Sequence, residues 1–264
     1  MQTVVNGITL AYTDEGGGTP LVFVHGFPLS RDTWSKQVEA FRSTHRVIAP
    51  DLRGLGQSEA QPGTNTMERF ADDVHALLRQ LETGPVVLVG HSMGGYVALA
   101  FARRYAEMLR GLVLVATKAG ADTQEGAAGR RATAEKVKLE GTDGVVGAMA
   151  PRMLAAGNHD AAMAAQVREL MEPSKPEGVI GALLGMAERP DSTPMLGLIR
   201  VPTLVVTGAD DTIIPPAESE TLANGIPDAQ LRVIPNAGHL VAFERPDELN
   251  AALKEWLDRA AASA

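Results

Sequence analysis

Apolar residues in this chain form short uninterrupted runs, separated by longer stretches of mixed apolar and polar positions. At the N-terminus two short segments rich in β-branched and apolar residues, 3–5 and 8–12, flank Asn6-Gly7, which predicts a β-hairpin with a type I′ turn. Farther along, short runs rich in aliphatic residues are mostly apolar at consecutive positions, which predicts strands covered on both faces, as in a parallel sheet. These runs are residues 21–24, 46–49, 86–89, 112–115, 203–206 and 231–234.

Helical spacing appears between these predicted strands. Apolar residues from Met67 to Leu81 recur at intervals of three and four positions, which predicts a helix with one apolar face. Leu249, Leu253 and Trp256 repeat this spacing near the C-terminus. Strands that alternate with helices after an antiparallel start predict a doubly wound α/β fold.

The segment 118–195 interrupts this alternation. It contains no convincing strand, so we expect a helical cap, residues 118–195, inserted into an α/β core of residues 1–117 and 196–264. Six of the ten methionines lie in this segment. Their flexible thioethers suit a surface that packs against varied ligands, but they equally suit the interior of a small helical subdomain. The helix-length blocks of the segment are residues 129–140, 143–156, 160–172 and 176–188.

The composition narrows the partners and the chemistry. A net charge of −8 over 264 residues disfavours nucleic acids and anionic membrane surfaces, because both bind basic faces. The chain has no cysteine, which excludes disulfides, thiolate metal sites and cysteine nucleophiles. No apolar run is long enough to span a bilayer, and the N-terminus lacks the pattern of a signal peptide, so we expect a cytoplasmic protein. We expect the alanine-rich tail, residues 260–264, to fray.

Gly90-His91-Ser92-Met93-Gly94 lies between a predicted strand and a helix-like stretch. A G-x-S-x-G sequence in this position is typical of a nucleophile elbow, in which the chain turns too sharply for side chains two residues on either side of the serine. The simpler interpretation is that Ser92 only caps the following helix. If the elbow is real, the rest of the chain must provide a base, an acid and an oxyanion hole.

A candidate base follows a later strand. His239 comes shortly after the run 231–234 and after Ser92 in the chain, as the order nucleophile, acid, base requires. Loops at the carboxyl ends of strands are where α/β folds hold reactive groups. We interpret the other histidines as surface, cap or packing residues, and they are His25, His45, His75, His91 and His159.

The acid is expected at another strand end, between the nucleophile and the base. Asp210 and Asp211 both follow the run 203–206, and Asp122 is a weaker third candidate. One of the adjacent pair would bind the base, and the other would be a turn aspartate bonded to its own backbone.

The oxyanion hole needs two backbone N–H groups. One is expected from Met93, the residue after the nucleophile. The other is expected from Phe27, in the loop after the run 21–24, where Gly26 lets the backbone approach a substrate. Pro28 has no N–H and cannot serve.

These residues predict acyl transfer by a serine nucleophile. Ser92 would attack a carbonyl carbon while His239 takes its proton, and water would then release the acyl group from the enzyme. This chemistry needs no metal and no organic cofactor, and its partner is a small-molecule ester or lactone. Tentative pocket residues are His25, Gly26, Trp34, Met149, Met153 and Val241.

Taken together, the motifs resemble the α/β-hydrolase superfamily over nearly the whole chain. The resemblance implies an eight-stranded, mostly parallel sheet with a helical cap. In that superfamily the acid is usually the third residue after a glycine, Gly208 here, which favours Asp211 over Asp210. The matching segments are H-G-F-P (25–28), D-L-R-G-x-G-x-S (51–58), G-H-S-M-G-G (90–95), P-T-L-V-V-T-G-A-D-D (202–211) and G-H-x-x-x-x-E-R-P (238–246).

The resemblance extends to particular groups within the superfamily. H-G-F-P-L-S at 25–30, with Trp34 and Gln37, is similar to non-haem haloperoxidases, perhydrolases and aryl esterases. The cap and the C-terminal third resemble 3-oxoadipate enol-lactonases, and C–C bond hydrolases share the same frame. Ser92 argues against haloalkane dehalogenases and epoxide hydrolases, which carry aspartate at the elbow. The lack of cysteine argues against dienelactone hydrolases.

The resemblance implies a serine hydrolase of small or short-chain carboxylic esters, with Ser92, Asp211 and His239 as its catalytic residues. Enol-lactone hydrolysis, cofactor-free perhydrolysis and C–C bond hydrolysis are alternatives within the superfamily. Some of its members act instead as small-molecule receptors with little or no turnover, and the intact motifs argue against that role.

Overall fold

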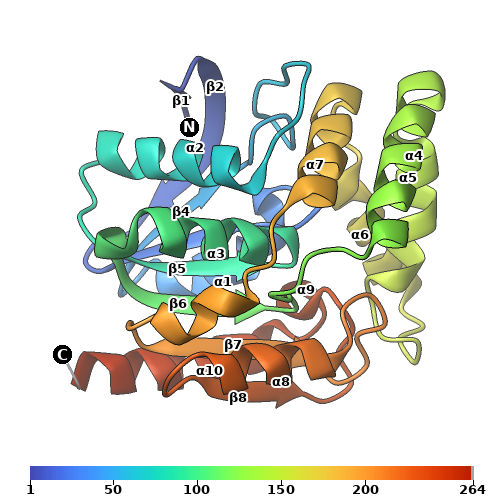
Figure 1. The fold of residues 1–264 in the computed structure, drawn as a ribbon. Coiled ribbons are helices and arrows are strands. Elements are labelled where there is room, and N and C mark those ends of the chain that lie inside the picture. The colour runs from blue at the N-terminus through green and yellow to red at the C-terminus, as the bar shows by residue number, and fades with distance from the viewer. Residues whose placement is uncertain (263–264) are drawn as a thin grey trace.

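The computed structural model describes residues 1–262. A β-sheet forms the centre of the molecule. Its strands are β1 (Gln2–Val5), β2 (Ile8–Glu15), β3 (Pro20–Val24), β4 (Arg46–Pro50), β5 (Val86–His91), β6 (Leu109–Val115), β7 (Thr203–Gly208) and β8 (Gln230–Ile234). Within the described residues they form one eight-stranded sheet in the order β1-β2-β4-β3-β5-β6-β7-β8 (Figure 1). The predicted α/β fold is confirmed.

The first two strands form the predicted hairpin. β1 pairs antiparallel with β2, and Asn6 and Gly7 have φ angles of 45° and 76°, both positive as a type I′ turn requires. β2 also runs antiparallel to β4, whereas the later neighbours in the sheet are parallel. The carboxyl ends of the parallel strands therefore meet at one edge, where the loops that follow them collect.

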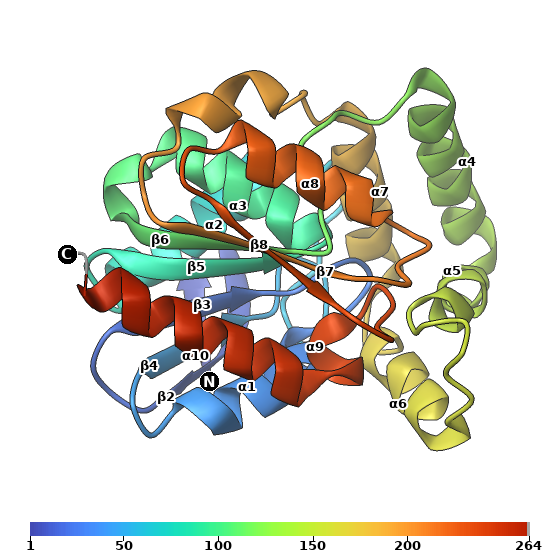
Figure 2. The ribbon, with the colours of Figure 1, turned by 90° about the horizontal axis from the view of Figure 1, so that it is seen from below.

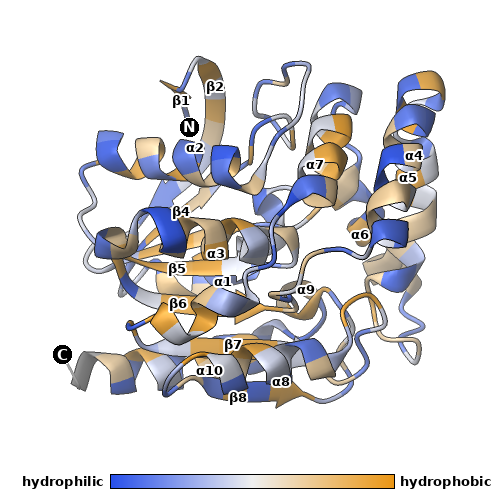
Figure 3. Cartoon of the chain, viewed as in Figure 1, coloured by the Kyte–Doolittle hydropathy of each residue, from blue (hydrophilic) through white to orange (hydrophobic). Residues whose placement is uncertain are grey.

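Helices cover both faces of this sheet (Figure 2). Successive residues of a strand face opposite sides, so Val22 packs in one apolar layer and Phe23 in the other. Burial on both faces explains the apolar runs of β3 to β7. The edge strand β8 differs from the prediction, because its burial alternates and Leu231 and Val233 are exposed. Figure 3 shows apolar strands inside helices whose outer faces are polar. One face carries α2 (Met67–Gln80), α3 (Met93–Arg104) and α8 (Pro216–Gly225), and the other carries α1 (Ser35–Phe41) and α10 (Pro246–Ala262).

A group of helices between β6 and β7, here called the cap, stands at one end of the sheet (Figure 1). Its members are α4 (Gln124–Glu140), α5 (Asp143–Met149), α6 (Ala161–Met171) and α7 (Pro176–Glu188). The block predicted at 143–156 is the one that differs most, since α5 ends early and a 3-10 turn containing Pro151 follows. Proline has no N–H to continue an α-helix, which accounts for the break.

The helix α7 packs directly against the backbone of the core. Gly178 and Gly185 have no side chain, and a Cβ at either position would overlap the carbonyl oxygen of Gly54 or Asn65, respectively. The Asn65 N–H donates to the carbonyl of Gly181 over 2.9 Å, which joins the two segments. α4 in turn packs along α7, so this contact fixes the position of one wall of the cap.

A hydrogen-bond network orders the loop between β4 and α2. The Asp51 carboxylate accepts the N–H groups of Arg31 (2.7 Å) and Gln57 (2.9 Å). The buried Arg53 guanidinium donates two bonds of 2.7 Å to Asp73 on α2. These bonds stabilise the loop that contains residues 51–56 and connect it to α2.

The end of the chain is more regular than predicted. The helix α10 continues to Ala262, so part of the tail expected to fray is helical, and residues 263–264 lie outside the described residues. Across the described part of the chain, no helix is both long and apolar enough to cross a membrane.

The backbone contact of α7 generates a stability prediction. We expect Gly178→Ala to lower the free energy of unfolding by about 1–3 kcal/mol, the usual effect of overpacking, because the new Cβ displaces α7 from Gly54. The control is Gly147→Ala in α5, where the glycine is exposed and nothing lies within 4 Å of the added carbon. Urea denaturation of both variants measures the difference, and equal stabilities would contradict the close contact.

Candidate active site

The predicted elbow forms the turn between β5 and α3. Ser92 has φ 53° and ψ −115°, a strained conformation for a residue with a side chain. A Cβ at Gly90 would overlap the carbonyl of Gly94, so the turn requires glycine there. The Ser92 N–H donates to Val115 on β6 (2.9 Å) and the Thr117 hydroxyl donates to the Ser92 carbonyl (2.7 Å), which hold the strained residue in place.

The structure brings the three predicted side chains together. The Ser92 hydroxyl lies 2.9 Å from Nε2 of His239, and Nδ1 of His239 lies 2.8 Å from Oδ2 of Asp211. In the neutral tautomer that fits these partners, Nδ1–H donates to the carboxylate and Nε2 accepts from the hydroxyl. Ser92 makes no capping hydrogen bond to α3, so its hydroxyl serves this chain of contacts and the simpler cap interpretation is wrong.

The two adjacent aspartates have different environments. Asp211 is buried, and its Oδ1 accepts the N–H groups of Ile213 (2.8 Å) and Ile214 (2.9 Å), which aims Oδ2 at His239. Asp210 is exposed, and its own N–H donates to the carbonyl of Ala237. The carboxylate that contacts His239 therefore belongs to Asp211, which also makes the turn hydrogen bonds expected of its neighbour.

The third candidate acid lies elsewhere. Asp122 forms ion pairs with Arg130, with Arg189 (3.0 Å) and with Lys118 (3.5 Å), and its partners are cations rather than a histidine. It is not an acid for His239.

His91 supports the histidine loop from behind. Its Nε2–H donates to the carbonyl of His239 over 2.9 Å, and the two rings lie 4.9 Å apart. Burial, followed by the charge of His239, lowers the pKa of His91 to about 3, so the ring is neutral at physiological pH. His25 is also buried, and its Nε2 accepts the N–H of Leu52 over 2.9 Å.

The remaining histidines are distant from this chemistry. His75 stacks on Tyr105, His45 packs edge-on against Phe41, and His159 is exposed in the cap. Of the six histidines, His239 is the one whose ring lies within hydrogen-bond distance of the Ser92 hydroxyl.

Glu244, on the short helix α9 (Val241–Glu244), connects the histidine loop with the cap. Its buried carboxylate accepts the N–H of Gly238 (2.6 Å), the N–H of Ala155 (3.1 Å) and the side-chain amide of Asn158 (2.7 Å). Sequence reasoning did not assign this role, although Glu244 lies in the matched segment 238–246. The acid thus ties the loop before His239 to the cap segment after α5.

The expected oxyanion donors lie beside the serine. Met93 is the first residue of α3, and helix geometry leaves the first N–H groups without an intrahelical acceptor. Among the described residues, no backbone hydrogen bond uses the N–H of Met93 or Phe27. A Cβ at Gly26 would lie 3.1 Å from Cβ of Ser92, so the glycine permits the close approach that was predicted.

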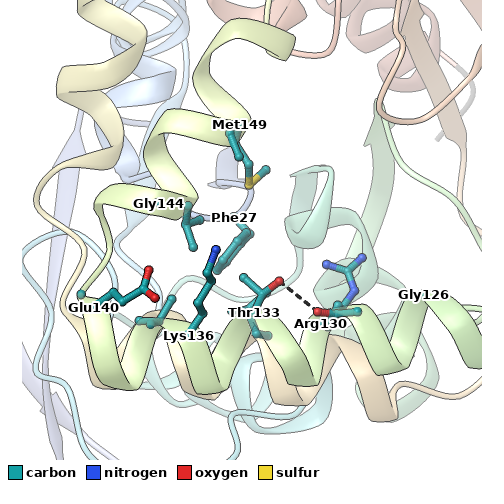
Figure 4. Close-up of a pocket in the computed structure, with 14 residues that line it drawn as sticks. Phe27, Gly126, Arg130, Thr133, Lys136, Glu140, Gly144 and Met149 are labelled. Carbon is teal, nitrogen blue, oxygen red and sulfur yellow. Dashed lines mark hydrogen bonds between the residues drawn. The ribbon is translucent and has the colours of Figure 1, made fainter.

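A cavity of about 150 Å³ opens at the serine. It adjoins a larger cavity of about 450 Å³ between α4 and α5, and the two share Phe27, Arg130 and Met149 (Figure 4). The smaller cavity is lined by Phe27, Ser92, Tyr96, Lys118, Arg130, Met149, Met186, Ile213, Ile214, Pro215 and Glu218.

The expected pocket residues are only partly found there. Met149 lines both cavities, and Gly26 lies beside Ser92. The other four side chains are buried and absent from the cavity lining, which corrects the expectation: Trp34 packs on Phe23 with ring centroids 5.0 Å apart, and Met153 packs within the cap. His25 and Val241, too, lie behind the site rather than along the cavity.

Several lining residues were missed by sequence reasoning. Tyr96 lies four residues after Ser92, one helical turn along α3, a spacing that could have identified it. Arg130 and Lys118 carry no such signal, because their place at the cavity depends on how the cap packs.

A family model of the α/β hydrolase fold matches residues 19–246. The chain belongs to the α/β-hydrolase family. A thermophilic esterase from Thermogutta terrifontis, in its malate-bound form, has a TM-score of 0.94 and 45% identity, with 98% of this chain and 97% of that chain covered. The enol-lactonase from Burkholderia xenovorans LB400 has a TM-score of 0.90 and 28% identity, with 98% and 100% covered.

A sequence relative adds a third name. The non-heme haloperoxidase of Rhodococcus erythropolis is 31% identical, with 97% of this chain and 98% of the relative covered. The predicted resemblance to the superfamily and to its haloperoxidase and enol-lactonase groups is therefore confirmed. Because the relatives carry different activities, family membership alone does not select the reaction.

The contrast between the two aspartates generates a kinetic prediction. We expect Asp211→Asn to lower kcat for an ester substrate by about 10⁴-fold, because an amide favours the wrong tautomer of His239. Asp210→Asn removes the same charge one residue away and should leave kcat within threefold. Steady-state kinetics of the two purified variants make the comparison, and equal losses would contradict the assignment of Asp211.

The buried histidines generate a prediction about stability and pH. Since the pKa of His91 is about 3 in the folded state and near 6.5 when unfolded, the unfolded chain binds an extra proton between these values. Unfolding should therefore become easier as the pH falls below 6.5, by up to about 1.4 kcal/mol per pH unit for this group. His91→Gln should flatten that dependence, whereas the exposed His159→Gln should not, as urea denaturation from pH 7 to pH 4 would measure.

Proposed function

We propose that this protein is a serine hydrolase of small carboxylic esters that acts through an acyl-enzyme. The observation that carries the proposal is the unbroken set of contacts from the Ser92 hydroxyl through the His239 ring to the Asp211 carboxylate, at 2.9 and 2.8 Å. A neutral serine hydroxyl is a weak nucleophile, and a base within hydrogen-bond reach is what activates it.

The reaction begins with proton transfer. His239 takes the hydroxyl proton through Nε2 as Ser92 attacks the carbonyl carbon, and Asp211 stabilises the imidazolium that results. The protonated ring then gives its proton to the leaving alcohol, which departs and leaves the acyl group on Ser92. Water, activated by the same ring, attacks this ester and restores the serine.

Negative charge develops on the carbonyl oxygen during both attacks. The N–H groups of Phe27 and Met93 are the proposed donors to this oxygen, and the loss of one such donor typically costs about 3 kcal/mol. His91 is neutral beside the site, so the imidazolium of His239 forms without a second positive ring next to it.

The cavity volume supports small substrates. A cavity of about 150 Å³ accepts a molecule the size of benzene, so the space beside Ser92 suits a short acyl group. The adjoining cavity of about 450 Å³ would hold the rest of the substrate.

Lactone hydrolysis is a second candidate, favoured by the similarity to the enol-lactonase from Burkholderia xenovorans LB400. A lactone is a cyclic ester, so the same serine attack opens its ring. The difference is that the leaving alcohol remains attached to the acyl group, and the cavity must hold both parts together.

A direct test uses aryl acetates and a panel of lactones. We expect steady turnover of p-nitrophenyl acetate, and a loss of more than about 10⁴-fold in kcat for Ser92→Ala. A p-nitrophenyl phosphonate should transfer its phosphonyl group to Ser92 in the native chain, with release of p-nitrophenol, and should leave the variant unmodified. Comparison of kcat/KM between acetates and lactones selects between the two candidates.

Two results would contradict the proposal. Esterolysis that survives in Ser92→Ala would place the reaction elsewhere. An acyl burst without turnover would indicate a receptor that retains a reactive serine.

A further inference from the structure

Three cationic side chains surround one carboxylate at the edge of the cavity that contains Ser92. Lys118 follows β6, Arg130 lies on α4, and Arg189 follows α7, and all three form ion pairs with Asp122. Lys118, Arg130 and Arg189 are here called the cation cluster. One carboxylate cannot neutralise three cations, so the cluster retains positive charge next to the proposed reaction centre.

Asp122 is ionised in this arrangement. Burial opposes its ionisation, but the hydrogen bond and charge of Arg130, followed by the charges of Arg189 and Lys118, lower the pKa of Asp122 overall. Its Oδ2 binds Nε of Arg130 and its Oδ1 binds Nη2 of Arg189 over 3.0 Å. Asp122 therefore acts as a brace that orients both guanidinium groups.

The guanidinium groups of Arg189 and Arg130 differ in how their nitrogens are used. Arg189 is buried, with its guanidinium 3.9 Å from the centre of the Tyr96 ring, so its orientation is fixed by packing. Arg130 uses only Nε, and no hydrogen bond among the described residues involves its two terminal nitrogens. In Figure 4 the Arg130 side chain rises from α4 beside the larger cavity, and the same residue lines the cavity at Ser92.

Tyr96 adds a neutral donor beside these cations. Burial raises the pKa of Tyr96, although Arg189 and Arg130 oppose the shift, so the phenol stays protonated. Its hydroxyl has no hydrogen-bond partner among the described residues, and the side chain lines the same cavity as Ser92. A carboxylate can accept hydrogen bonds from a phenol O–H and from the free N–H groups of a guanidinium.

Glu218 is the one acidic residue of this cavity lining. It is partly exposed, and no ion pair within the described residues joins it to Lys118 or Arg130. Three cations against Asp122 and Glu218 still leave a positive charge at this end of the cavity.

We propose that Arg130, Lys118 and Tyr96 form a subsite for a carboxylate group of the substrate. The preferred esters would then be half-esters of short dicarboxylic acids, with their neutral analogues hydrolysed less efficiently. Arg130 would bind the carboxylate through its two free nitrogens, while Lys118 adds charge and Tyr96 one hydrogen bond. This inference rests on the proposed attack by Ser92, since it names the substrate class of that same site.

A purely structural role for the cation cluster makes a different prediction. If Arg130 only braces the cap through Asp122, its removal would weaken the fold and slow all substrates alike. If it binds substrate, its removal would affect anionic esters selectively.

The test compares charged and neutral esters of equal acyl length. Monomethyl succinate, glutarate and adipate are paired with methyl butanoate, pentanoate and hexanoate, and hydrolysis is followed in a pH-stat. We expect kcat/KM to be at least tenfold higher for one or more of the half-esters than for its neutral partner. Arg130→Gln should lower that value at least tenfold, mainly through KM, and change the neutral ester less than threefold.

Two matched variants complete the design. Arg131→Gln removes the same charge from an exposed neighbour on α4 and should leave the preference unchanged. Arg130→Lys should restore part of it, because the charge returns without the guanidinium fork. A thermal melt of each variant confirms that it is folded. No preference for any half-ester in the native chain, or an equal loss for both ester classes in Arg130→Gln, would overturn the subsite.

A binding experiment separates this inference from the proposed function. Isothermal titration calorimetry with succinate, glutarate and adipate on Ser92→Ala needs no turnover, and we expect binding that disappears when Arg130→Gln is added. Such binding without any Ser92-dependent hydrolysis would leave the subsite standing while the proposed function fails. Ser92-dependent hydrolysis of neutral esters, with none of these dicarboxylates bound, would overturn the subsite alone.

Discussion

The strained backbone of Ser92 is the constraint on which the rest of the site depends. A residue with φ 53° and ψ −115° persists only where its surroundings hold it, and here both of its backbone polar groups are bonded, to Val115 and to Thr117. Because Gly90 and Gly94 have no side chain, β5, α3 and the loop after β3 can approach one another closely. That approach places the hydroxyl, the imidazole and the expected oxyanion donors around one point.

The sequence predicted those parts of the fold and of the site that depend on local backbone requirements. An elbow needs glycine at fixed offsets, a type I′ turn needs Asn-Gly, and a strand buried on both faces needs consecutive aliphatic residues, so each leaves a short readable pattern. The choice between Asp210 and Asp211 was different, because both follow the same strand. Two N–H groups, from Ile213 and Ile214, decide it by turning one carboxylate inward.

The pocket could not be predicted in the same way because it depends on packing between distant segments. Trp34 and Met153 are large and apolar, which made them plausible lining residues, yet both are fully buried among other apolar side chains. In the sequence, nothing distinguishes Arg130 from the other charged residues of α4. It reaches the cavity because α4 packs along α7, and α7 in turn rests on Gly54 through Gly178, a contact between residues far apart in the chain.

The protein has a negative net charge, whereas its cavity carries a positive one. Which of them acts on a substrate depends on the distance between the substrate and the charged groups. The net charge of −8 is a sum over the whole chain, and salt screens interactions between exposed charges beyond about 8 Å at physiological ionic strength. The cation cluster is partly buried and is screened less. An anion arriving from solution therefore gains little from long-range attraction, and its recognition depends on the short-range donors of Arg130 and Tyr96. The subsite should consequently favour anionic esters through slow dissociation rather than fast arrival.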